Sequence, residues 1–197
     1  MNVGLRNWVV ALVLLAVLWV SREWMQAHMA RHMLLQMPML AWVGWLFHTC
    51  LGGSTEERIK PWNREGLSGF ILFQCLTAFW MVPRAIDLAL TSPTTAAIKA
   101  TGWILAGFLL RQSMRQSHPA VQFFMFGNFA MMTAAVSDIY EHAPNRLCNA
   151  YRTNDQVVVA HGLVLMLVAM LVVWTLYTWR VSHNKLRHGN YPKLSTL

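Results

Sequence analysis

Two histidines, His28 and His32, lie four residues apart in a segment rich in methionine. An α-helix advances 100° per residue, so it places such a pair on one face, one turn apart. Met25, Met29 and Met33 have the same four-residue spacing and would form a row on the helix beside the histidines. Imidazole and thioether together suit soft Cu(I) and suit magnesium, calcium or manganese poorly. We therefore interpret these five residues as candidate ligands for Cu(I).

The composition indicates an integral membrane protein. Hydrophobic residues make up 56% of the 197 residues and charged residues only 12%, whereas a soluble domain carries about a quarter charged residues. Apolar runs long enough to span a bilayer recur along the chain. These runs are continuous and do not alternate with polar residues, which predicts helices and excludes barrel strands. Most basic residues fall in loops and in the tail, so membrane topology explains the net charge of +8 better than a nucleic-acid partner does.

We expect an all-α polytopic bundle of about six transmembrane spans, forming a single integral membrane domain of residues 1–197. The expected spans cover residues 5–22, 24–51, 67–90, 94–112, 119–140 and 155–179, and a basic cytoplasmic tail covers residues 180–197. Pro38 is expected to kink the second span, and Lys99 weakens the case for the fourth. The first span is read as a retained signal anchor, because no small-residue cleavage site follows it. The distribution of basic residues favours both termini in the cytoplasm.

This topology gathers unusual polar residues at the outer side of the membrane. His28 and His32 begin the second span, and Asp155 and His161 lie in the first turns of the last. The other polar residues expected at this depth are Asp87, Asp138, Glu141, His142, Cys148 and Gln156. Polar groups in spans normally face one another or a cavity. Each also has a structural explanation: methionine fills gaps in a core, a lone histidine bonds between helices, and Asp155 caps a helix.

Two short motifs resemble a known membrane family. Residues 28–35 read HMARHMLL and are followed by Pro38, which resembles the HMxxHMLL-type motif of the multi-pass CtaG-type family of cytochrome c oxidase assembly proteins. Residues 155–156 read DQ and are followed by Gly162 and Met166, which is similar to that family's DQ motif at the start of a late span. The family is associated with assembling oxidases of the caa3 kind and with delivering copper.

The resemblance implies a copper-binding metallochaperone that supplies or holds Cu(I) for assembly of a membrane copper oxidase. It implies that His28, Met29, His32 and Met33 bind copper. Asp155 and His161 would be further contributors. The implied partners are a haem-copper oxidase, with which a hetero-oligomer can form, and membrane lipids. From the helical spans and a presumed bacterial source we expect a location in the inner membrane, and the expected topology places the metal site on the periplasmic side.

Other functions stay open on the sequence alone. Histidines on different spans, such as His32 and His161, can be axial ligands of haem b, so a haem b- or quinone-binding accessory subunit of a respiratory complex is an alternative. A transporter or a purely structural membrane subunit is a further one. We expect no enzyme activity, because the chain shows no nucleophile–base arrangement and no phosphate-binding loop. The three scattered cysteines lack zinc-site spacing.

Overall fold

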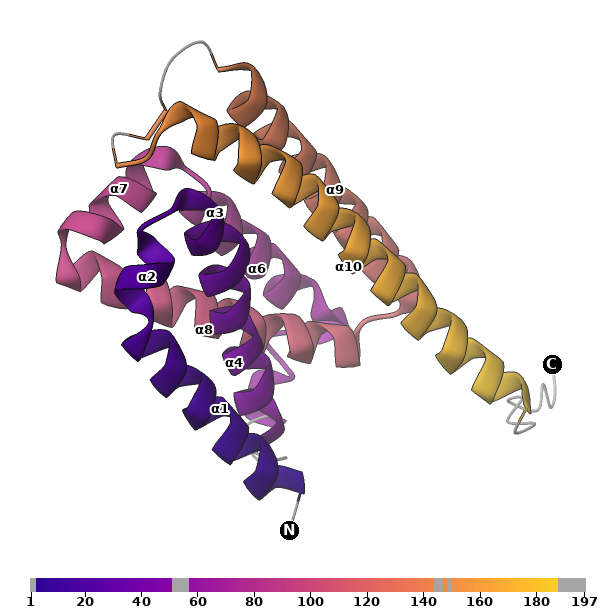
Figure 1. Cartoon of the computed structure of the whole chain (residues 1–197). Coiled ribbons are helices and arrows are strands. Elements are labelled where there is room, and N and C mark those ends of the chain that lie inside the picture. Colours follow the sequence, from indigo (N-terminus) through magenta and orange to yellow (C-terminus); the bar gives the residue numbers. More distant parts are fainter. Residues whose placement is uncertain (1–2, 51–56, 144–146, 149, 188–197) are drawn as a thin grey trace, which may run out of the picture.

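The computed structural model describes residues 3–50, 57–143, 147–148 and 150–187, and every regular element in these ranges is a helix. The main helices are α1 (Val3–Val20), α4 (Met37–Cys50), α6 (Leu67–Trp80), α7 (Pro83–Thr91), α8 (Pro93–Gln116), α9 (Pro119–His142) and α10 (Thr153–Arg187). In Figure 1, α9 and α10 run side by side as a long pair, while the other helices gather into a bundle around α8. The expected all-α class is confirmed.

The segment that carries the histidines is not one continuous helix. It consists of α2 (Arg22–Gln26), a short α3 (Met29–Arg31) and a π-helical turn η1 (His32–Gln36), which continues into α4. His28 has an extended backbone, with φ −132° and ψ 138°, and precedes α3 as its N-cap. The π-helical turn ends at Gln36, two residues before Pro38. Because proline lacks an N–H and its ring crowds the carbonyl four residues back, a wider turn there relieves the crowding.

The expectation of six membrane spans is wrong. Within the described residues, two helical segments are long and apolar enough to cross a membrane, Pro119–His142 and Asn154–Arg180. A third candidate is the pair formed by Arg64–Trp80 and Pro83–Thr91, which is bent by 73° at its break. The chain is therefore a candidate membrane protein with two or three spans.

Physical reasons account for the missing spans. The apolar part of α1 is shorter than a bilayer-spanning helix requires. The expected second span is divided at His28, where the backbone is extended. The expected fourth span corresponds to α8, which is long but carries Lys99, Arg111 and Arg115 and is too polar by composition. The bend in the expected third span falls just before Pro83, with Val82 in an extended conformation.

Helices α4 and α8 cross very closely, and glycine on each helix makes this possible. A Cβ atom added to Gly44 would overlap the backbone carbonyl of Ile104, and one added to Gly107 would overlap the carbonyl of Ala41. Backbone cannot move aside as a flexible side chain can, so both positions require glycine. This crossing fixes α8 against the segment that leads into α4.

We expect Gly107→Ala to lower the free energy of unfolding by about 1–3 kcal/mol, because the added methyl group overpacks the crossing. The matched control is Gly127→Ala on α9, where an added Cβ meets nothing within 4 Å. This control should leave stability unchanged or raise it by about 0.5–1 kcal/mol, because alanine favours the helix. Unfolding in mixed detergent micelles measures both, and equal effects of the two substitutions would contradict the close crossing.

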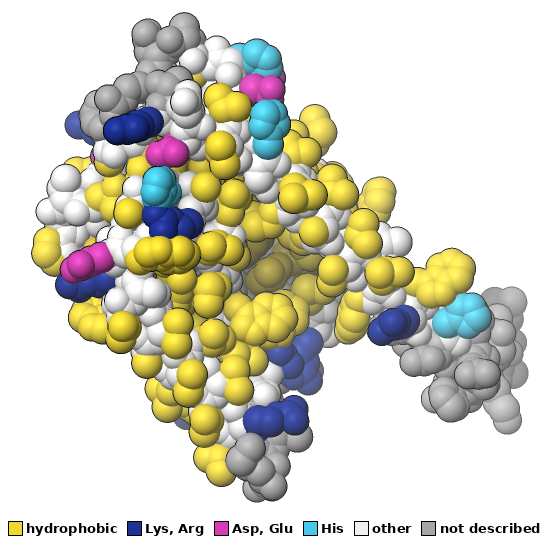
Figure 2. All heavy atoms as spheres, viewed as in Figure 1, with side chains coloured by type: hydrophobic (Ala, Val, Ile, Leu, Met, Phe, Trp, Pro, Cys, Tyr) yellow, Lys and Arg dark blue, Asp and Glu magenta, His cyan; other side chains and the backbone are white. Residues whose placement is uncertain are grey.

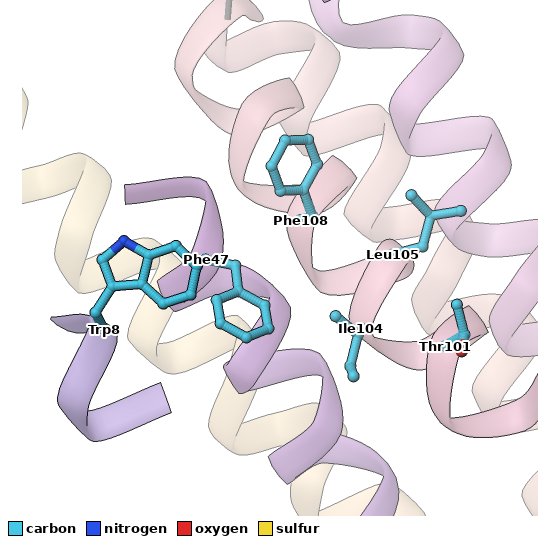
Figure 3. Close-up of a pocket in the computed structure, with 6 residues that line it drawn as sticks. All are labelled: Trp8, Phe47, Thr101, Ile104, Leu105 and Phe108. Atoms are coloured by element: carbon cyan, nitrogen blue, oxygen red, sulfur yellow. The ribbon is translucent and has the colours of Figure 1, made fainter. Parts of the chain in front are cut away.

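An apolar groove runs along α8 on the side facing α1 and α4. It has a volume of about 380 Å³ and is lined by Trp8, Phe47, Thr101, Ile104, Leu105 and Phe108 (Figure 3). Among the described residues that line it, the Thr101 hydroxyl and the Trp8 indole N–H are the polar groups, and none of these residues is titratable. It is therefore not a candidate for the chemistry predicted from the histidines.

Candidate functional site

A buried hydrogen bond joins Lys99 on α8 to His32 on η1. The Lys99 Nζ lies 2.7 Å from His32 Nε2 and donates a second, longer hydrogen bond of 3.4 Å to Gln36 Oε1. Lys99 is 2% exposed and His32 is 0% exposed. The π-helical turn begins at His32 and ends at Gln36, so both of its terminal residues contact the same amine. Such π-helical turns are frequent at functional sites.

The second ring nitrogen of His32 contacts a tyrosine from the loop before α10. His32 Nδ1 lies 2.8 Å from the Tyr151 hydroxyl, and that hydroxyl donates to the Gln26 carbonyl over 2.9 Å. Since the hydroxyl proton is used on Gln26, Nδ1 must carry the proton that Tyr151 accepts. His32 Nε2 is then the acceptor for Lys99. The chain of contacts therefore fits a neutral His32 protonated on Nδ1.

Burial also favours a neutral imidazole. His32 and Lys99 lie outside the candidate membrane spans. Burial, with a smaller contribution from the neighbouring Lys99, lowers the pKa of His32 below its ordinary value. Burial likewise lowers the pKa of Lys99. Among the described contacts of Lys99 there is no carboxylate, so the amine depends on His32 and Gln36 for its polar interactions.

His28 does not share a face with His32, contrary to the sequence prediction. The His28 side chain is 58% exposed and its Nδ1 lies 3.8 Å from Asp155 Oδ1 on α10. The extended backbone at His28 ends the helical periodicity on which the prediction relied. Asp155 itself lies in the first turn of α10 and not at the N-cap position. Its negative charge in the first turn still complements the helix dipole.

The predicted thioether ligands are buried in the main hydrophobic core. Met25, Met29 and Met33 belong to one cluster of buried residues, which also contains Met37 and the free thiol of Cys148. The cluster also includes Tyr151, the hydrogen-bond partner of His32. These sulfur side chains are therefore buried in the same core as the tyrosine that contacts His32.

The Cys148 thiol stays protonated at neutral pH. Burial, with a smaller contribution from Asp87, raises its pKa to about 12. Asp87 Oδ1 accepts a hydrogen bond from the Ala150 amide at 3.3 Å, which holds the carboxylate near this loop. A thiolate ligand at Cys148 would thus require a cation to displace the proton.

His161 is placed apart from the buried histidine. It is exposed on α10, and its Nε2 lies 3.5 Å from Glu141 Oε1 on α9. On α9, His142 Nδ1 lies 3.1 Å from Asp138 Oδ1. Figure 2 shows histidine and acidic side chains together on the surface at the end where α9 ends and α10 begins. Across the described part of the chain, no three His, Cys, Asp or Glu residues are close enough to hold a metal ion.

Sequence reasoning missed two members of the buried network, Lys99 and Tyr151. On the sequence alone Lys99 only weakens the case for a membrane span, although a lysine in an apolar segment is itself a signal of a polar partner. Nothing in the sequence pairs Tyr151 with His32, because 119 residues separate them. Comparison of the chain with known protein families, characterised proteins and solved structures finds no match.

We expect His32→Leu to lower the free energy of unfolding by about 2–3 kcal/mol, because it leaves the Lys99 amine buried without its closest acceptor. Lys99→Met should cost less, since it removes the buried cation together with its need for a partner. The double variant should lose less unfolding free energy than the two single variants lose together, which a double-mutant cycle in detergent micelles measures. Additive effects would show that the two side chains do not stabilise each other.

Proposed function

We propose that this chain is a membrane metallochaperone that holds Cu(I) for assembly of a membrane copper oxidase of the haem-copper type. The single observation that supports the proposal is that several sulfur side chains are buried in the core cluster to which Tyr151, the partner of His32, also belongs. Met25, Met29 and Met33 share a core cluster with Cys148, and His28 lies at the surface just before Met29. Thioether, thiol and imidazole are the ligands that Cu(I) prefers.

His28 is the ligand that a copper donor meets first in this proposal. Its side chain is exposed, and the nearby Asp155 carboxylate adds negative charge beside it. Met29 follows His28 directly and is buried, so it offers a thioether on the inner side. An exposed imidazole followed by buried thioethers allows stepwise ligand exchange, which delivery to another protein requires.

His32 is less available than His28 as a ligand in the proposed site. Both of its ring nitrogens are engaged, one by Lys99 and one by Tyr151. A cation at His32 must displace one of these contacts, so we propose that His32 joins the ligand set after His28. The same engagement disfavours the haem alternative, because an axial histidine also needs a free ring nitrogen.

The test of copper handling is anaerobic Cu(I) loading of the detergent-purified protein with a competing chelator. We expect the wild type to bind Cu(I), and His28→Ala or Met29→Leu to weaken binding by about tenfold or more, by analogy with the loss of supporting groups at metal sites. His142→Ala is the matched control, because that histidine lies at the same end but pairs with Asp138. Wild-type protein that binds no Cu(I) would refute the proposal, and a Soret band would support haem.

We further propose that the end carrying His28 and Asp155 faces the outer side of a bacterial inner membrane. With two or three spans, the order of the remaining basic residues is the support for this orientation. Arg111 and Arg115 lie in the last turns of α8 and Arg180 lies in the second half of α10, away from the start of α10, whereas Arg31 and Arg152 lie at the His28 end. Basic residues beside spans stay on the cytoplasmic side.

A reporter fused to the C-terminus tests this orientation. We expect a C-terminal green fluorescent protein to be fluorescent and a C-terminal alkaline phosphatase to be inactive, because both would lie in the cytoplasm. The complementary pair of fusions after His142 should give the opposite result, since α9 and α10 are antiparallel. Active phosphatase at the C-terminus would reverse the orientation and place the histidine end inside.

A further inference from the structure

Two amide side chains form a polar pair on the surface of the helices α6 and α9. Asn128 Nδ2 donates to Gln74 Oε1 over 2.7 Å, and Gln74 Nε2 donates to the Met125 carbonyl, also over 2.7 Å. Asn128 is exposed and lies near the middle of α9, which over its whole length is a candidate membrane span. Both polar atoms of Gln74 thus have a partner within the chain, while Asn128 still has a carbonyl oxygen and one N–H to offer.

The surface around Asn128 is apolar. Phe124 and Met131, one turn away on either side along α9, are 68% and 73% exposed. On α6, Ile71 is also exposed. Residues 121–137 of α9 contain no charged side chain. In a bilayer this face of the helix would meet hydrocarbon, and Asn128 would be the polar exception in it.

A free amide in hydrocarbon is unfavourable, because no water is present to satisfy its carbonyl and N–H. Polar side chains of this type associate membrane helices by bonding across their interface. A carboxamide is both donor and acceptor, so it is complementary to a second carboxamide. Two copies inserted in the same orientation carry Asn128 at the same depth, and a two-fold axis along the membrane normal brings the two side chains together.

We propose that a second copy of this chain docks on the α9 face around Asn128, forming a parallel dimer in which the two Asn128 side chains hydrogen-bond across the two-fold axis. Gln74 holds each Asn128 in position by accepting its other N–H. Phe124 and Met131 supply the apolar contacts on either side. The interface uses none of the residues of the proposed copper site.

Resonance energy transfer between two differently coloured fluorescent fusions in liposomes tests the dimer. We expect transfer above that of randomly distributed proteins, and Asn128→Leu should lower the association constant about tenfold. Asn128→Gln, which keeps the amide, should retain most of the transfer. Phe123→Leu is the control, because Phe123 is equally exposed on α9 but lies against Trp174 of α10.

The outcomes separate this inference from the proposed function. Transfer that is unchanged in Asn128→Leu would overturn the role of Asn128, and circular dichroism of that variant excludes misfolding as the cause of a loss. Absence of transfer in the wild type would overturn the second copy as the occupant, leaving a helix of another protein as the partner. Cu(I) binding is measured on the same samples, and neither result of the transfer experiment changes the outcome expected for it.

Discussion

The hydrogen bond between Lys99 and His32 is the constraint around which one end of the molecule is arranged. A buried amine with no carboxylate among its described contacts needs a neutral acceptor, and His32 provides one at 2.7 Å. Tyr151 completes the arrangement by accepting from the other ring nitrogen and donating to the backbone at Gln26. Three distant segments of the chain are thereby joined through one imidazole, whose protonation follows from its two partners.

The break at His28 and the π-helical turn that follows serve the same arrangement. An uninterrupted helix would have kept His28 and His32 on one face. His28 could not then have reached Asp155 at the surface while His32 contacted Lys99 in the core. With the break, His28 is left at the surface beside Asp155 while His32 enters the core. The close crossing at Gly44 and Gly107 then sets α8 near enough for Lys99 to reach His32. Local irregularity and close packing thus depend on each other.

The proposed copper function and the proposed dimer draw on different parts of the molecule. The first rests on sulfur and imidazole groups near the start of α10, and the second on an amide in the middle of α9. A pair of long helices, α9 and α10, carries both. The two proposals therefore do not depend on each other.

The sequence by itself determined the helical class and a membrane-like composition, because long apolar runs with little charge leave few other structures open. It also pointed to the end of the molecule where His28 and Asp155 meet. It overestimated the number of spans, since hydropathy does not register the extended residue His28 or the break before Pro83. Only the tertiary structure decided that Lys99 and Tyr151 are the partners of His32, because contacts between residues far apart in the chain follow from how helices pack and not from spacing along it.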